Sequence, residues 1–434
     1  MNKSNWENIP VSLLLSVLSV TALLLMRDIL GISVNKMFFV LIVVGACLFM
    51  NYRSIIALLF FLMPVLNGLP GNYILPVVAL ALFIKQPTLM SRNGYVFFTL
   101  LALFEIVHYP FYSFSTDIPL TIGYLSVLFL MCYTISIKDG SLDYKQCLLF
   151  FCMGNVVFLL IILGISSAHG GSVASFVAEG YRIGETKDLA EPMEGQLMIN
   201  ANPNGLGAFA ITGAAIVLVL YKARRISALI LSVFLAVFIL VGTLSFSRTF
   251  FLCLALLLFL VVVVKGGEKK LRKRLPSIFA LVIIVGALLF FLFSNELIYN
   301  VIYNRFAGDD MSTGNGRTEI MLMYHNWLSQ HPICFLFGTG AVHYQDVVNL
   351  PSACHNAIQQ IVVSYGIVGL FLFAVLVVSA IKYSYNKFFL YLIPFIVVFI
   401  SVQASRILNP WNNLYLFFAV FYVMKVGQKT PNNI

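Results

Sequence analysis

Residues 145–166 read KQCLLFFCMGNVVFLLIILGIS and hold one charged side chain, Lys145. A helix that crosses a bilayer needs about 20 mainly apolar residues. This stretch is therefore predicted to be a transmembrane helix. The chain contains up to fourteen apolar segments of this kind. They lie near 9–26, 34–50, 54–67, 72–84, 95–109, 117–136, 145–166, 203–221, 226–243, 249–264, 277–294, 356–380, 388–405 and 411–425.

Composition indicates the same fold class for the whole chain. Of the 434 residues, 60% are hydrophobic and 10% are charged, against about 25% charged in an ordinary soluble domain. The seven cysteines are scattered, with neither metal-ligand spacing nor the even number of a disulfide framework. These features exclude a soluble fold, a nucleic-acid binder, a secreted disulfide scaffold and a disordered chain. We predict one integral membrane domain over residues 1–434, an all-α helical bundle of 12–14 transmembrane helices.

One pair of segments leaves the helix count open. The segments 54–67 and 72–84 are short and are separated by the turn-forming run Asn67–Asn72. They form either a re-entrant hairpin or two tilted spans. The first apolar stretch is not followed by a small-residue cleavage site, so we expect it to be a retained helix.

Basic residues predict the orientation of the bundle. Lys265–Arg274 and Lys222–Arg225 are dense basic clusters, and loops rich in Lys and Arg usually face the cytoplasm. When successive loops are assigned to alternate sides of the membrane, starting from these clusters, 19 of the 27 basic residues lie inside and eight lie outside. Both termini then lie inside. We therefore expect both termini in the cytoplasm and two long non-cytoplasmic segments, 167–200 and 295–355.

The first polar motif, Ala201–Gly207 (ANPNGLG), opens a predicted span. Asn202 can cap the helix, and Pro203 suits its first position because that N–H would be unpaired anyway. A helix N-terminus is also a natural anion site. Asn202 and Asn204 are therefore interpreted either as capping residues or as part of an anion site.

The second motif, Ser245–Thr249 (SFSRT), places Arg248 where the next apolar run begins. A charge near hydrocarbon is costly and tends to be functional. The alternative is an interfacial arginine that extends to lipid headgroups. The flanking serines add hydrogen-bond donors, which favours an anion site.

The third motif, Gly314–Glu319 (GNGRTE), precedes a predicted helix. Arg317 and Glu319 would lie in its first turn, where the helix dipole favours anions over a guanidinium. A residue placed against its local preference indicates a functional role, and the alternative is an ordinary surface arginine.

The fourth motif is Cys354-His355-Asn356 at the outer end of a predicted span. A histidine suits proton transfer at neutral pH, although an isolated interfacial histidine is more often structural. Glu105 and His108 lie one turn apart near the end of another span, and we interpret them as a packed structural pair, with a proton relay as the alternative. No histidine spacing places two ligands on one helix face, so no metal site is predicted.

These motifs follow one another along the predicted outer face. They are Asn202-Pro203-Asn204, Ser247-Arg248, Gly316-Arg317 with the downstream Trp327, the run from His331-Pro332 to Gly338-Thr339-Gly340, and His355-Asn356 followed by Tyr365-Gly366-Ile367-Val368-Gly369. In order and spacing, from about residue 195 to 380, the chain resembles the O-antigen ligase and Wzy-type polysaccharide polymerase superfamily of bacterial inner membranes. The N-terminal half matches only as a series of spans.

The resemblance implies a GT-C-like membrane bundle that needs no metal or other cofactor. It implies transfer of a glycan from an undecaprenyl-diphosphate carrier to an acceptor hydroxyl on the periplasmic face. Arg248 and Arg317 would hold the diphosphate, and His355 would act on the hydroxyl. The remaining substrate-binding candidates are Arg182, Arg305, Asn202, Asn204, Glu319 and Asn356.

The expected partners are the undecaprenyl-diphosphate-linked glycan donor and acceptor and the membrane lipids, with a chain-length regulator protein as a further candidate and no nucleic acid. Within the resemblance, a polymerase adds the chain to the next lipid-linked repeat unit, whereas an O-antigen ligase transfers it to lipid A–core. We favour the O-antigen polymerase because two long outer segments suit two lipid-linked substrates. A polysaccharide flippase or transporter is a further alternative, although such proteins carry repeats and mid-membrane charges that are not visible here.

Overall fold

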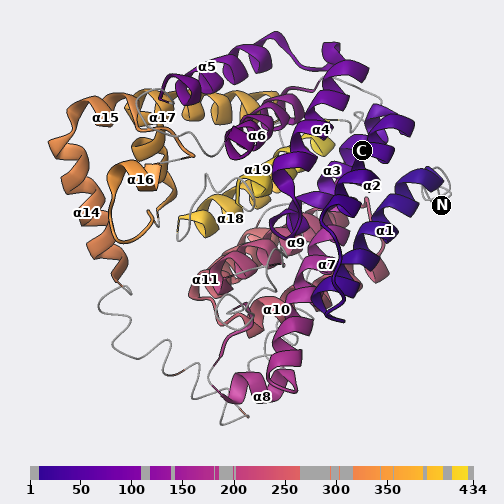
Figure 1. Cartoon of the computed structure of the whole chain (residues 1–434). Helices are drawn as coiled ribbons and strands as arrows, with labels where there is room; N and C mark the ends of the chain where they lie inside the picture. Colours follow the sequence, from indigo (N-terminus) through magenta and orange to yellow (C-terminus); the bar gives the residue numbers. More distant parts are fainter. Residues whose placement is uncertain are drawn as a thin grey trace.

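The computed structural model describes residues 9–108, 118–137, 142–179, 181–184, 199, 202–263, 294, 303, 316–342, 344–354, 356–384, 389–403 and 413–428. Within these residues every regular element is a helix, which confirms the predicted all-α bundle (Figure 1). Five of the described helices are long and apolar enough to cross a membrane, and seven shorter apolar helices accompany them. The span predicted near 277–294 lies outside the described residues except for residue 294.

The described part of the N-terminal half is a succession of helices. Its elements are α1 (Val11–Asp28), α2 (Met37–Phe49), α3 (Tyr52–Leu62), the 3-10 helix η2 (Met63–Gly68), α4 (Gly71–Lys85), the 3-10 helix η3 (Pro87–Leu89), α5 (Arg92–His108), α6 (Ile118–Ser136), α7 (Tyr144–His169) and the short α8 (Val173–Ala178).

The C-terminal half contains two of the five long apolar helices and three shorter helices between residues 317 and 348. Its described elements are α9 (Pro203–Lys222), α10 (Ala228–Leu244), α11 (Arg248–Val263), α14 (Arg317–Gln330), α15 (Pro332–Phe337), α16 (Tyr344–Val348), α17 (Ala357–Ser384), the 3-10 helix η8 (Phe389–Leu392), α18 (Ile393–Val402) and α19 (Asn413–Gln428). Part of the predicted loop 295–355 is therefore helical, since α14, α15 and α16 lie side by side next to α17 (Figure 1).

The hairpin formed by α3, η2 and α4 makes contacts at both of its ends, and these contacts show how far it extends. At its tip, the Gly68 carbonyl accepts a hydrogen bond of 2.7 Å from Arg27, at the end of α1. At its other end, the Lys85 ammonium donates to the carbonyls of Leu48 and Met50, at the end of α2. Because α1 and α2 are consecutive packed helices, these contacts favour two full spans over a shallow re-entrant hairpin.

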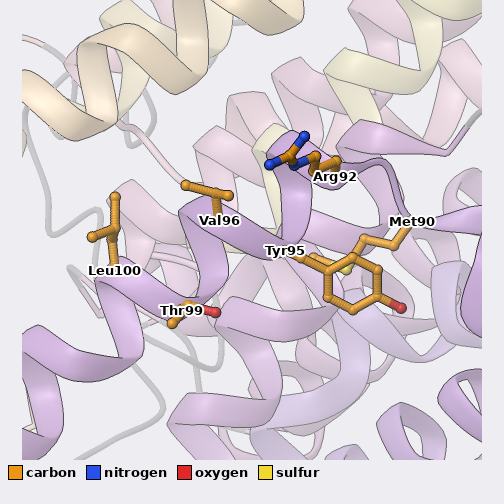
Figure 2. Close-up of a pocket in the computed structure, with 6 residues that line it drawn as sticks. All are labelled: Met90, Arg92, Tyr95, Val96, Thr99 and Leu100. Atoms are coloured by element: carbon orange, nitrogen blue, oxygen red, sulfur yellow. The ribbon is translucent and has the colours of Figure 1, made fainter.

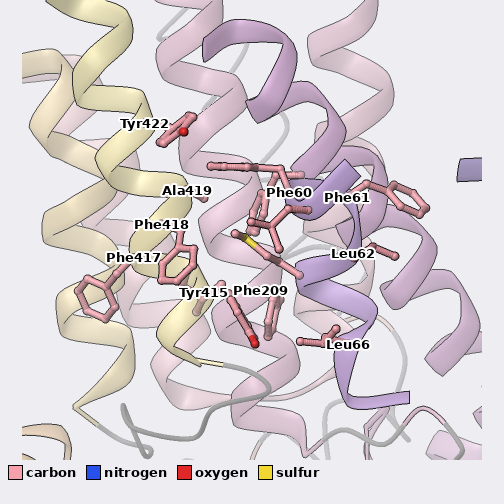
Figure 3. Packing of buried hydrophobic residues seen from close by; sticks show 14 of the residues in the cluster. Phe60, Phe61, Leu62, Leu66, Phe209, Tyr415, Phe417, Phe418, Ala419 and Tyr422 are labelled. Atoms are coloured by element: carbon pink, nitrogen blue, oxygen red, sulfur yellow. The ribbon is translucent and has the colours of Figure 1, made fainter. Parts of the chain in front are cut away.

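The core lies where α3, α7, α9 and α19 meet, and Figure 3 shows its aromatic side chains packed between these helices. The rings of Phe60 and Tyr422 lie 4.4 Å apart, centre to centre. On α7, Gly154 lets the backbone of α3 approach closely, since a Cβ there would lie 2.0 Å from the Phe61 carbonyl oxygen. Next to it, the Asn155 side chain donates to the Phe209 carbonyl of α9 at 2.6 Å. This tightly packed centre holds the outer ends of α7 and α9 in place.

The long helix α17 is interrupted at Gly366, which adopts a left-handed φ of +68°. The interruption frees backbone carbonyls, and the turn after α15 satisfies two of them. Thr339 N–H donates to the Val363 carbonyl at 2.9 Å, and Gly340 N–H donates to the Ser364 carbonyl at 2.8 Å. Irregular backbone at membrane depth is tolerated only where protein or water satisfies its polar groups. The turn after α15 and the break in α17 are therefore one structural unit.

Candidate active site

Three predicted arginines come together from separate parts of the chain. Arg248 is the first residue of α11, Arg317 is the first residue of α14, and Arg182 lies in the short segment 181–184 after α8. Burial lowers the pKa of Arg317, and the positive charges of Arg248 and Arg182 lower it further. The three side chains are half-buried. We call Arg182, Arg248 and Arg317 the arginine cluster.

Backbone contacts place Arg182 in this cluster. Its neighbour Ile183 donates its N–H to the Leu244 carbonyl, at the end of α10, at 3.3 Å. Gly184 has a φ of +100°, and a Cβ there would lie 3.2 Å from the Pro203 nitrogen at the start of α9. The segment therefore crosses the end of one helix and the start of another, and Arg182 reaches Arg317 from that position.

A tight turn between α10 and α11 sets the position of Arg248. Within it, Phe246 is buried and has a φ of +45°, a left-handed conformation that costs a non-glycine residue of order 1–3 kcal/mol. The buried Ser247 hydroxyl donates to the Asn204 side-chain oxygen at 3.0 Å, which ties this turn to the start of α9. Backbone strain of this kind persists only where the surrounding structure over-determines it, so Arg248 projects from a rigid turn.

Asn202 and Asn204, at the start of α9, make different contacts. The Asn202 side chain accepts the Gly205 N–H at 2.7 Å and so caps α9, as one of the two interpretations predicted. Asn204 instead orients Ser247, as described above. The N-termini of α9 and α11 meet here, and both carry partial positive charge. The local backbone therefore adds to the positive potential of the arginine cluster.

Arg317 begins α14 directly after Gly316, which has a φ of +70° and provides no side-chain cap. Glu319 lies in the same first turn, as predicted, and its side chain is exposed. The helix is fixed to its surroundings further along, where the Tyr324 hydroxyl donates to the Ser352 carbonyl at 2.9 Å. The position of Arg317 is therefore set by a helix anchored beside α17.

The predicted base His355 and the reserve candidate Arg305 lie outside the described residues. Both neighbours of His355 are described. Cys354 is buried, and the Asn356 side chain accepts the Gln359 N–H at 2.9 Å, which caps α17. The structure thus gives Asn356 a capping contact, and its predicted role in substrate binding stays a prediction.

Glu105 and His108 contact the turn after α15 rather than each other. The two Glu105 carboxylate oxygens accept the N–H groups of Ala341 and Val342, at 2.9 and 3.1 Å. The His108 Nε2 atom lies 3.1 Å from the Gly338 carbonyl oxygen. A packed structural role was predicted for Glu105 and His108. Their contact with the turn 338–342 was not predicted, because these contacts are made to backbone groups, which no side-chain pattern in the sequence marks.

Figure 2 shows a shallow pocket of about 520 Å³ at the beginning of α5, lined by Met90, Arg92, Tyr95, Val96, Thr99 and Leu100. It contains none of the predicted site residues and lies at the opposite end of α5 from Glu105 and His108. Val96 and Leu100 are exposed apolar residues, as expected on a lipid-facing surface. Within the described part of the chain, no three His, Cys, Asp or Glu side chains gather as metal ligands would.

Residues 231–374 match the family model described as O-antigen ligase. The matched stretch is 144 of the 434 residues and runs from α10 into α17. It includes Arg248, Arg317 and the position of His355, whereas Arg182 and Glu105 lie outside it. No curated protein and no solved structure matches the chain. The match supports the resemblance to the O-antigen ligase and polymerase superfamily, and with it a ligase- or polymerase-type activity.

Proposed function

We propose that this chain, whose residues 231–374 match the O-antigen ligase family, is a membrane glycosyltransferase that polymerises undecaprenyl-diphosphate-linked repeat units into O-antigen or capsular polysaccharide. The observation that carries the proposal is the arginine cluster. Arg248 and Arg182 lie close enough to Arg317 for their charges to lower its pKa, and the N-termini of α9 and α11 meet beside Arg248, so this region is positive and suits an anionic ligand with several oxygens. A diphosphate offers such oxygens, and guanidinium groups bind phosphate in a two-pronged geometry.

The chemistry proposed at this site is a glycosyl transfer. The acceptor hydroxyl oxygen forms a bond to the anomeric carbon of the donor, and the bond from that carbon to the diphosphate oxygen breaks. The bonding electron pair leaves with the diphosphate, where the arginine cluster stabilises the developing charge. The hydroxyl proton passes to His355 as general base, which typically contributes about 10²–10⁴ in rate.

The family description favours a second candidate function, the O-antigen ligase, in which the same transfer ends on lipid A–core. The machinery for leaving-group stabilisation would be unchanged, and only the acceptor would differ. We favour the polymerase because the outer face carries two substantial segments. The first holds Arg182, and the second holds Arg317 together with α14, α15 and α16, and two long segments beside one diphosphate site leave room for a second lipid-linked substrate.

The test uses purified protein with a synthetic lipid-diphosphate oligosaccharide as both donor and acceptor, in the presence of EDTA. A polymerase produces a ladder of longer lipid-linked chains and releases lipid diphosphate. A ligase leaves the oligosaccharide at one length until a lipid A–core acceptor is added. Movement of the lipid across liposomes without any new glycosidic bond would contradict both functions and support a flippase.

The proposal also requires the arginine cluster to be periplasmic, with both termini and the basic cluster at 265–274 in the cytoplasm. The split of the basic residues, 19 inside and eight outside, supports this orientation. In a cysteine-free variant, an impermeant thiol reagent added to spheroplasts should label Asp310→Cys and leave Lys270→Cys unmodified until the membrane is permeabilised. The reverse pattern would invert the orientation and place the site on the cytoplasmic face.

A further inference from the structure

Glu105 is a buried carboxylate near the end of α5, with 5% of its surface exposed. Burying a charge is costly unless the charge is paired or hydrogen-bonded. Here each carboxylate oxygen accepts one backbone N–H, from Ala341 at 2.9 Å and from Val342 at 3.1 Å. The Tyr365 hydroxyl of α17 donates to the Tyr124 hydroxyl of α6 at 2.7 Å. Glu105 therefore holds a segment that is distant in the sequence.

His108, one turn along α5, holds the other end of the same turn. Its Nε2 atom contacts the Gly338 carbonyl oxygen at 3.1 Å, and its Nδ1 atom contacts the Phe104 carbonyl oxygen at 2.5 Å. The His108 ring therefore bridges the last turn of α5 and the turn after α15. We call Glu105, His108 and the turn 338–342 the latch.

The latch fastens this turn from one side, and α17 fastens it from the other. Thr339 and Gly340 donate to the carbonyls of Val363 and Ser364 at the break in α17. In Figure 1, α5 runs beside α17 and α15, so the turn lies between two spans. Little freedom remains for the segment that follows the turn.

That following segment leads to the predicted base. It contains α16 and ends at Cys354, and its buried side chains Tyr344, Val348 and Cys354 pack in one cluster with Tyr324 of α14. The next residue in the chain is His355, and α14 begins with Arg317. A shift of the turn would thus be passed to both sides of the candidate active site.

We propose that Glu105 and His108 are positioning residues, which fix the segment 344–354 and thereby the placement of the acceptor-activating group relative to the arginine cluster. This inference rests on the proposed function. A misplacement of about 1 Å can lower a catalytic rate by about 10²-fold, so a latch outside the active site can control turnover. The latch makes and breaks no covalent bond and does not contact the donor.

The first arm of the test measures hydrogen–deuterium exchange in peptides that cover residues 338–354. Glu105→Gln keeps one amide acceptor but turns a second donor toward a backbone N–H, and His108→Asn removes the contact with Gly338. Both variants should exchange faster than the wild-type protein throughout this segment. Glu179→Gln, which changes an exposed glutamate directly after α8, is the control. Wild-type exchange in both latch variants would overturn the proposal.

The second arm measures initial rates with the lipid-diphosphate donor, per folded molecule. We expect kcat to fall about 10- to 100-fold in each latch variant, with a smaller change in KM for the donor because all three arginine side chains are still present. The double variant should be no slower than the slower single variant, since both changes open one latch. If the latch variants exchange faster but keep the wild-type kcat, the latch is only a structural contact, and its positioning role is overturned. If the wild-type protein transfers no glycan, the proposed function fails, and the exchange measurement still decides whether the latch holds 344–354.

Discussion

Replacing His355 with alanine is expected to lower the rate of glycan transfer by about 10²–10⁴, the usual contribution of general base catalysis. Expression, folding and donor binding should be retained, because the arginine cluster does not depend on this side chain. His355→Gln should not restore the rate, since an amide forms hydrogen bonds but accepts no proton near neutral pH. Initial rates at saturating donor, measured on purified protein, provide the comparison.

The pH dependence gives a second readout for His355. A base works in its neutral form, and an unperturbed imidazole has a pKa of about 6.5. The wild-type rate should therefore be highest above that pH and should fall as the pH drops through it, whereas the residual rate of His355→Ala should lack this step. His325→Ala, on the exposed face of α14, is the control. Near wild-type turnover in His355→Ala would make Glu319 the next residue to test.

Replacing Arg248 with alanine should lower kcat by about 10²–10³, as expected when one preorganised donor to a developing negative charge is removed. Arg248→Lys should fall between this variant and the wild-type protein, because lysine keeps the charge but loses the planar, two-pronged geometry. The matched control is Arg92→Ala. Arg92 is also the first residue of a helix, but it lies beside the distant pocket of Figure 2.

Anion binding to the cluster can be measured without turnover. A ligand that binds only the folded state raises the unfolding temperature, so inorganic pyrophosphate should stabilise the wild-type protein and Arg92→Ala alike. The increase should be smaller in Arg248→Ala and in Arg182→Ala. Equal stabilisation in all four proteins, or normal chain lengths made by Arg248→Ala, would remove Arg248 from the site.

Some of this structure could be predicted because it depends on local composition. Long apolar runs predict spans, and Asn202 followed by Pro203 predicts the start of α9, which the structure confirms. The break in α17 at Gly366 was not predicted, because the hydrophobic run continues on both sides of it. Hydropathy reports burial in lipid and carries no information about a carbonyl that is hydrogen-bonded to another segment.

The candidate site shows the same division between local and distant effects. Arg248 and Arg317 stand out by their positions at helix starts, and both were predicted. Arg182 was only a reserve candidate, since its role depends on a loop crossing the ends of α9 and α10. Glu105 was interpreted as part of a packed pair because its partners are backbone groups, which every residue carries. The roles of all of these site residues, with those of His355 and Arg305, stay predictions.

The long separation in sequence between Glu105 and the residues it contacts has a consequence for biosynthesis. Ala341 follows Glu105 by 236 residues, and chains are synthesised at about 5–20 residues per second. The Glu105 carboxylate is therefore made about 10–50 s before the amides that hold it. During that interval it needs a substitute, either a proton on the carboxylate or water. The latch can close only after residues 338–342 have been made, so it belongs to the later part of the assembly of the bundle.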